Sequence, residues 1–175
     1  MNDLAVVAAQ IERRPRSQID VRARCHLGLP VVIAVPPHLD DGTPFPTRFW
    51  LTCPLAVRRI GRLESVGGVK AAEARLAADD KQSARHAAAM ERYATERDRL
   101  IDSGFVGPRP TGGVAGAAQG VKCLHAHYAD YTAGNDNVVG EWTAADIDPL
   151  DCAQACVVAN GPVVERNPEW REPKR

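Results

Sequence analysis

The sequence has no long hydrophobic run and no excess of either charge. Its longest apolar stretches, residues 4–9 and 31–35, are far shorter than the roughly 20 residues that a transmembrane helix needs. The 22 Lys and Arg residues balance the 22 Asp and Glu residues, so the net charge is zero. Because affinity for nucleic acid comes mostly from neutralising phosphates, a nucleic-acid-binding protein is not expected. A membrane-spanning protein is not expected either.

Targeting and cofactor signatures are also missing. The first residues lack the basic and apolar segments of a secretory signal, so we expect a cytoplasmic protein. In a reducing compartment the five cysteines are expected to be thiols or metal ligands rather than disulfides. The chain contains no Cys-x-x-Cys pair and no Walker phosphate loop. Any site must therefore combine residues that lie far apart in the sequence.

The hydrophobic patterns predict an α+β fold. Strands are predicted at 20–25, 31–35 and 47–52, where side chains alternate or are β-branched. Helices are predicted at 3–13, at 54–66, in two segments across 70–103, and at 120–133. The expected architecture is one domain over residues 1–158, with a small antiparallel sheet of about three strands and several helices packed on it. Residues 159–175, rich in proline and charge, are predicted to be a disordered tail.

The helix predicted at 81–103 is long and charged. Its apolar stripe is thin and consists of Met90, Tyr93 and Leu100. The simplest interpretation is a solvated helix that lies on the sheet. The alternative is a helix that binds a protein partner.

A cluster of potential metal ligands lies near the middle of the predicted 120–133 helix. Cys123 and His127 are four residues apart, so on a helix they share a face and form a candidate chelating pair. His125 would point the other way and is then a candidate core histidine. If the helix begins later, the roles of the two histidines are reversed.

The other four cysteines fall into two pairs. Cys152 and Cys156 are also four residues apart and can chelate from a helical turn or from a loop. Cys25 and Cys53 end the first and third predicted strands, which run parallel in an up-down-up sheet. They therefore lie at the same end of the sheet, about 10 Å apart. That separation is too large for a disulfide, but loops can bring both thiols onto one metal.

All five cysteines can thus meet at one end of the domain. Thiolates combined with imidazoles select zinc or an iron–sulfur cluster. The leading hypothesis is therefore a metal-binding protein, and buried inert thiols are its main alternative. The candidate ligands are Cys25, Cys53, Cys123, His125, His127, Cys152 and Cys156.

Cys53 has a second interpretation, as a catalytic nucleophile. It precedes Pro54 at a predicted helix start, where backbone N–H groups and the helix dipole stabilise a thiolate. His125 or His127 would act as the base. A thiol-dependent enzyme is therefore the second hypothesis. The third is a metal-free adaptor protein that uses the 81–103 helix.

Several blocks resemble the bacterial domain-of-unknown-function family five hundred and one. They are Gly42-Thr-Pro-Phe-Pro-Thr-Arg-Phe-Trp-Leu-Thr-Cys-Pro54, Arg62-Leu-Glu64, Lys122-Cys-Leu-His-Ala-His-Tyr-Ala129, and the segment 25–32, in which a cysteine precedes Gly-x-Pro and a short strand. The resemblance covers roughly residues 3–156, with a departure at Asn137-Val-Val-Gly140, where the family has Asn-Pro-Val-Gly.

This resemblance implies no established activity. The family's genes, mainly actinobacterial, commonly lie near those for a septum-formation initiator and an exopolyphosphatase-like enzyme. The resemblance therefore implies a housekeeping role, and the adaptor hypothesis takes from it a link to cell division or polyphosphate metabolism. It also places Cys25, Cys53 and Cys123 inside the family's recurrent blocks.

Overall fold

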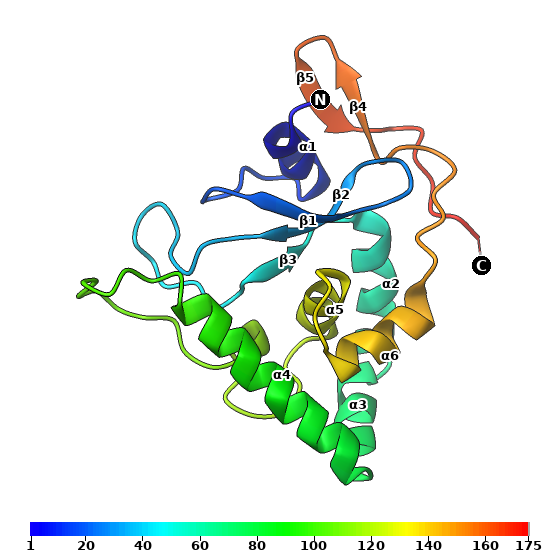
Figure 1. The fold of residues 1–175 in the computed structure, drawn as a ribbon. Helices are drawn as coiled ribbons and strands as arrows, with labels where there is room; N and C mark the ends of the chain where they lie inside the picture. Colours follow the sequence, from blue (N-terminus) through cyan, green and yellow to red (C-terminus); the bar gives the residue numbers. More distant parts are fainter. Residues whose placement is uncertain (175) are drawn as a thin grey trace.

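A three-stranded antiparallel sheet forms the first part of the fold (Figure 1). The computed structural model describes residues 1–174. The strands are β1 (Asp20–Arg24), β2 (Pro30–Ala34) and β3 (Phe49–Leu51), and β2 lies between the other two. A small antiparallel sheet packed with helices confirms the predicted α+β fold.

The central strand β2 is buried along its whole length because both faces of the sheet are covered. On one face, Ile33 packs with Val7 of α1 (Asp3–Gln10) in a small apolar cluster. On the other face, Val32 belongs to the main core. A continuous β-branched run suits such a doubly covered strand, since neither face needs polar side chains.

The remaining helices build the second part of the fold around the main core. Helix α5 is central among them and packs against β3, α2 and α6. The elements are α2 (Pro54–Ser65), α3 (Gly68–Ala77), α4 (Asp80–Asp98), the 3-10 turn η1 (Val114–Gly116), α5 (Leu124–Thr132) and α6 (Val138–Ile147).

Helix α4 ends five residues earlier than the predicted 81–103 helix. Its inner face is buried, and the hydroxyl of Tyr93 accepts hydrogen bonds from the backbone N–H groups of Arg48 and Phe49. This contact ties α4 to strand β3 and explains why so charged a helix has a fixed position. Partner binding by its outer face stays a prediction. Among residues 1–174, neither α4 nor any other helix is long and apolar enough to span a membrane.

The segment predicted to be a disordered tail forms a β-hairpin instead. Strands β4 (Val157–Asn160) and β5 (Val163–Arg166) pair antiparallel and pack beside α1. Further along, Trp170 belongs to the main core and is only 7% exposed. The proline and charge content suggested disorder, but a few apolar side chains anchor this segment. Of the predicted tail, residue 175 lies outside the described residues.

Candidate metal centres

Four of the five cysteines surround one small cavity. Cys25 follows β1 and Cys53 precedes α2, so both lie at the same end of the sheet, as predicted from the strand directions. Cys152 and Cys156 reach the cavity from the loop between α6 and β4. All four are free thiols, and the void between them measures about 10 Å³. The predicted convergence therefore holds for these four cysteines but not for Cys123.

Cys53 differs from the catalytic thiolate that its position at a helix start suggested. The backbone N–H groups of Leu55 and Ala56 lower the pKa of its thiol, as expected at a helix N-terminus, although Cys53 makes no capping hydrogen bond through its side chain. Burial has the larger effect, however, and raises the pKa of the Cys53 thiol to about 12. The side chain is also only 6% exposed. A protonated, inaccessible thiol is a poor nucleophile, so the structure gives the catalytic interpretation no support.

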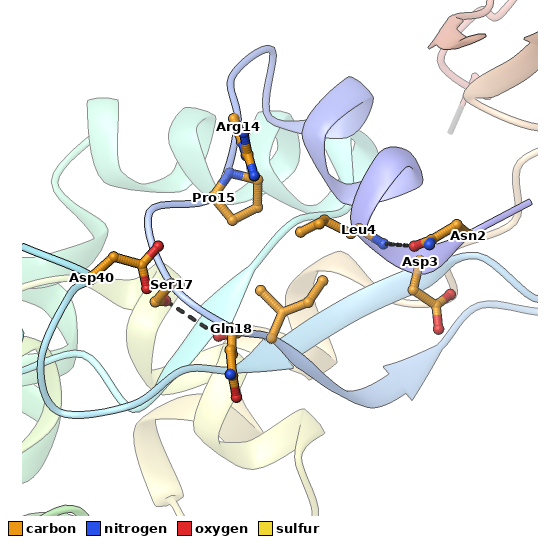
Figure 2. Close-up of a pocket in the computed structure, with 9 residues that line it drawn as sticks. Asn2, Asp3, Leu4, Arg14, Pro15, Ser17, Gln18 and Asp40 are labelled. Carbon is orange, nitrogen blue, oxygen red and sulfur yellow. Dashed lines mark hydrogen bonds between the residues drawn. The ribbon is translucent and has the colours of Figure 1, made fainter. Parts of the chain in front are cut away.

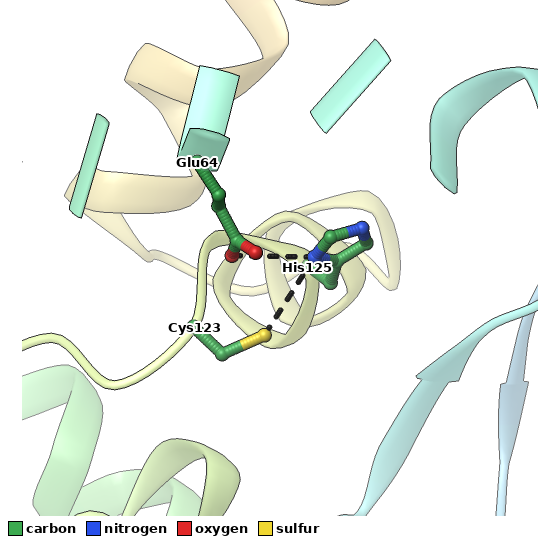
Figure 3. A group of neighbouring side chains, drawn as sticks. All are labelled: Glu64, Cys123 and His125. Carbon is green, nitrogen blue, oxygen red and sulfur yellow. Dashed lines mark hydrogen bonds and ion pairs between the residues drawn. The ribbon is translucent and has the colours of Figure 1, made fainter. Parts of the chain in front are cut away.

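Cys123 instead forms a separate cluster with Glu64 and His125 (Figure 3). Glu64 lies near the end of α2, Cys123 is the N-cap residue of α5, and His125 lies in the first turn of α5. His125 Nδ1 is 3.2 Å from a carboxylate oxygen of Glu64 and 3.7 Å from Cys123 Sγ. One donor atom from each residue lies within 4.8 Å of the other two. The three side chains are half-buried, so the cluster is open to solvent on one side.

The orientation of the His125 ring is fixed by its other nitrogen. Nε2 lies 3.1 Å from the carbonyl oxygen of Val57. Because a carbonyl only accepts, Nε2 carries the hydrogen and donates it, which leaves Nδ1 facing Glu64 and Cys123. Burial opposes a charge on the imidazole, but the Cys123 and Glu64 side chains outweigh burial and raise the pKa of His125 to about 9. The cluster therefore favours a cation at this position.

Glu64 was missing from the residues predicted from the sequence, although it lies in one of the blocks that carry the family resemblance. Its carboxylate accepts a 2.6 Å hydrogen bond from the backbone N–H of Leu124. Cys123 makes no side-chain capping bond, so Glu64 caps α5 from a different helix. The only signal in the sequence was an acidic residue within a recurrent block, which does not reveal a contact 60 residues away.

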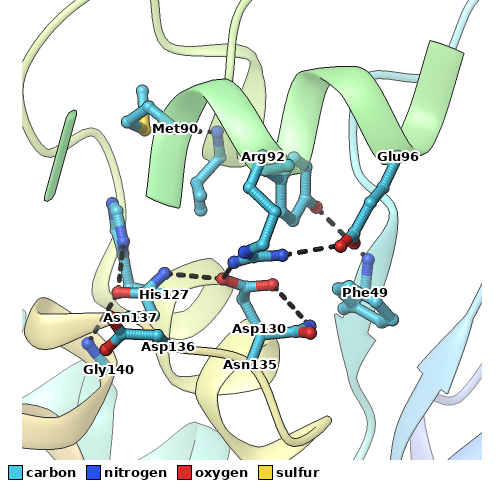
Figure 4. A network of polar contacts seen from close by, with 12 residues as sticks. Phe49, Met90, Arg92, Glu96, His127, Asp130, Asn135, Asp136, Asn137 and Gly140 are labelled. Carbon is cyan, nitrogen blue, oxygen red and sulfur yellow. Dashed lines mark hydrogen bonds and ion pairs between the residues drawn. The ribbon is translucent and has the colours of Figure 1, made fainter. Parts of the chain in front are cut away.

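His127 lies apart from Cys123, in a buried polar network (Figure 4). Its Nδ1 donates to the side-chain oxygen of Asn137, and the amide of Asn137 donates to Asp130. Asp130 also accepts from Arg92 at 2.6 Å. His86 lies next to the His127 ring, with ring centroids 5.3 Å apart. The proposed pairing of Cys123 with His127 is therefore wrong. Because α5 begins at residue 124, His125 rather than His127 lies beside Cys123.

An apolar groove borders the Glu64 cluster. Cys123 and His125 line one part of it, and Phe45, Phe49 and Trp50 line another, around a volume of about 360 Å³. A larger, polar hollow of about 580 Å³ lies elsewhere, between the start of α1 and residues 14–19 (Figure 2). That hollow contains none of the predicted ligands. The groove is therefore the cavity that adjoins the Glu64 cluster.

The fold and these donor clusters define an α+β domain with candidate metal ligands. The family model described as "Protein of unknown function (DUF501)" matches residues 21–145. The chain therefore belongs to this family, and the resemblance in its sequence blocks is confirmed. The matched region includes Glu64, Cys123 and His125, but it ends before Cys152. Comparisons with curated proteins and with solved structures give no match.

Proposed function

We propose that this chain binds a divalent metal ion through Glu64, Cys123 and His125, and that the ion is zinc because of the kinds of donor atom. One observation carries the proposal: a carboxylate oxygen, a thiol sulfur and an imidazole nitrogen lie within 4.8 Å of one another. Carboxylate, thiolate and neutral imidazole are the three kinds of side-chain ligand that zinc takes in proteins. The donors are already gathered, so binding requires small movements and the release of the proton that His125, with its pKa raised to about 9, holds at neutral pH.

The hydrogen-bond pattern favours a metal site over a cysteine–histidine nucleophile. In a catalytic relay, the thiol and the orienting carboxylate contact opposite nitrogens of the imidazole. Here Cys123 and Glu64 both face Nδ1 of His125. The other nitrogen donates to the carbonyl of Val57, which is the usual contact of the second N–H in a metal-bound histidine. The groups therefore converge on one point, where a cation would lie.

The coordination number suggests a reactive rather than a structural centre. Three protein ligands leave a fourth position, as in catalytic zinc sites, and a bound zinc ion would supply Lewis acidity or an activated water there. The neighbouring groove of about 360 Å³ is lined partly by Cys123 and His125. Its aromatic residues would bind the apolar part of a small substrate. A metal-dependent hydrolytic or Lewis-acid function follows from this arrangement.

A purely structural role explains some of the same contacts. Without a metal, Glu64 would still cap α5 through the N–H of Leu124 and would pair with a protonated His125. The two roles separate in the variant Glu64→Gln. Glutamine keeps an oxygen that can accept from Leu124, but it loses the negative charge that a metal ligand supplies. If Glu64 only caps α5, Glu64→Gln should change the stability of the protein little. If Glu64 binds the metal, the variant should lose much of its affinity for zinc.

The test is a titration of chelator-treated, reduced protein with Zn²⁺ by calorimetry and with Co²⁺ by visible absorption. We expect wild-type protein to show a site that is lost in His125→Gln and Cys123→Ser and weakened at least about tenfold in Glu64→Gln. His38→Gln, which removes a histidine from a surface loop, is the matched control. Equal affinity in all of these proteins, or no binding to wild-type protein, would contradict the proposal.

The other two functions predicted from the sequence have less support. The thiol-enzyme hypothesis depended on a readily ionised Cys53, but burial raises the pKa of that thiol. The adaptor hypothesis depends on the outer face of α4, and its contacts with other proteins stay a prediction.

A further inference from the structure

We propose a second, separate metal centre at Cys25, Cys53, Cys152 and Cys156, which takes a thiophilic metal as a four-thiolate site. This site is independent of the one at Glu64. Its four sulfur-bearing side chains line one cavity, together with mainly apolar residues such as Leu29. No carboxylate, histidine or cation lines it among the described residues. A purely thiolate ligand set selects zinc or an iron–sulfur cluster over harder ions.

The sulfurs receive hydrogen bonds from N–H groups. Trp170 Nε1 donates to Cys152 Sγ at 3.5 Å, and Gln10 Nε2 donates to Cys156 Sγ at 3.7 Å. Both donors belong to buried residues, 7% and 5% exposed respectively, and Gln10 Nε2 also contacts the carbonyl of Pro30 at 2.9 Å. N–H donors directed at sulfur stabilise thiolates more than neutral thiols, and they are a typical second shell of metal-bound cysteines. Buried inert cysteines do not require such donors.

The loop that carries Cys152 is fixed at its start by a buried cation. The side chain of Arg59 is only 3% exposed. It donates to the carbonyls of Ile147 and Pro149 and to the carboxylate of Asp151. Burying a guanidinium is costly unless its donors are used, and here the two terminal nitrogens hold the segment immediately before Cys152, while Nε is buried without a hydrogen-bond partner among the described residues.

Two further contacts connect the cysteine segments to each other and to the hairpin. His26 Nε2 lies 2.9 Å from the carbonyl of Cys152, which joins the segment after Cys25 to the Cys152 loop. The side chain of Asn167 donates to the carbonyl of Ala155, and its backbone N–H donates to the carbonyl of Cys156. The backbones that carry Cys25, Cys152 and Cys156 are therefore held together without any bond between their sulfurs.

The spacing distinguishes two possible occupants. Within residues 1–174, the Glu64 cluster is the group whose three donors meet the 4.8 Å spacing of a single-ion site. The four thiols would therefore have to rotate inward to bind one zinc ion, for which the void of about 10 Å³ has room. An iron–sulfur cluster holds its thiolates farther apart than one tetrahedral ion does, but it needs a larger void. The Cys152 loop would then have to move outward.

The experiment is metal analysis and absorption spectroscopy of wild-type protein purified without oxygen, and of chelator-treated protein reloaded with Co²⁺ or with iron and sulfide. We expect more than one metal equivalent per chain. Cys25→Ser and Cys156→Ser should remove the four-thiolate centre and leave the Glu64 site loaded, whereas Cys123→Ser should do the reverse. Co²⁺ at four thiolates gives a stronger sulfur-to-metal absorption band than Co²⁺ at one. A brown chromophore with iron and sulfide identifies a cluster, and a colourless zinc protein identifies a single ion.

A second measurement avoids variants that fail to fold. In wild-type protein, alkylation is followed by mass spectrometry at each cysteine before and after chelator treatment. The four-thiolate centre is supported if four cysteines are protected from alkylation and lose this protection together when the metal is removed. They are Cys25, Cys53, Cys152 and Cys156. The proposal is overturned if these four thiols react identically with and without metal, and if the only metal bound is the one that Cys123→Ser removes. Failure of the Glu64 site would leave this result unchanged.

Discussion

Acidification should destabilise the fold through His127. The side chain is 0% exposed, its Nδ1 donates to Asn137, and its Nε2 is buried without a hydrogen-bond partner. Burial lowers the pKa of His127 from 6.5 to about 4. The unfolded chain therefore takes up a proton near pH 6.5, whereas the folded chain resists it until near pH 4. The stabilising effect of the neutral ring is full above pH 6.5 and is lost as the pH falls toward 4.

The size of the effect follows from the two pKa values. A difference of roughly two and a half pKa units corresponds to about 3 kcal/mol of unfolding free energy lost by pH 4. Burial also lowers the pKa of the neighbouring His86, so its effect has the same sign. Carboxylates held at low pKa by ion pairs, such as Glu172 beside Arg62, contribute only below about pH 4.5.

The measurement is urea unfolding between pH 7 and pH 4, in the presence of a chelator, for wild-type protein and His127→Asn. Asparagine has an N–H that can still donate to Asn137, but it does not titrate. The variant should be less stable at pH 7 because of the lost volume, yet it should lose about 3 kcal/mol less on acidification than wild-type protein. His38→Gln controls for the loss of a histidine as such. Parallel loss of stability in wild-type protein and His127→Asn would refute this explanation.

Three substitutions should destabilise the fold, each measured by urea unfolding at pH 7. Tyr93→Phe removes the hydroxyl that accepts hydrogen bonds from the backbone N–H groups of Arg48 and Phe49, and should lower the free energy of unfolding by about 1–3 kcal/mol. An unchanged urea midpoint would show that water replaces the hydroxyl. Gly140→Ala places a methyl group 2.3 Å from the backbone carbonyl oxygen of His127, so α5 and α6 must separate, at a cost of about 1–3 kcal/mol or more. Arg59→Met leaves the carbonyls of Ile147, at the end of α6, and Pro149 without their donor and should cost about 3 kcal/mol, while Arg58→Met, on a neighbouring position, should cost far less.

Local patterns predicted the three-stranded sheet and the positions of two of the four cysteines that line the cavity. Alternation and β-branching are properties of short segments, so they revealed the three strands. The up-down-up order then placed Cys25 and Cys53 at one end of the sheet without further information. The arrival of Cys152 and Cys156 depends instead on Arg59, which holds a loop some 90 residues away. No periodicity in the sequence reports such a contact.

The start of α5 shows why the Glu64 cluster was only partly predictable. A helix start is usually recognised from a capping side chain such as Ser, Thr, Asp or Asn. Here the N-cap residue is Cys123, and the carboxylate of Glu64 supplies the capping bond from α2. The helix was therefore predicted to begin near residue 120, which put Cys123 and His127 on one face. Because the cap is a tertiary contact, both the later start and the role of His125 required the structure.

Helix α2 also explains why the cysteines divide into two groups. Cys53 is its N-cap residue and Glu64 lies next to its last residue, Ser65. The 11 intervening steps of 1.5 Å separate the two positions by about 16 Å along a rigid helix. Cys123 lies within 4.8 Å of Glu64, so it cannot share an ion with Cys53, given zinc–sulfur bonds near 2.3 Å. A single site built from all five cysteines, as the sequence suggested, is therefore wrong. The same rigid helix therefore supplies one ligand to each proposed centre and keeps the two centres apart.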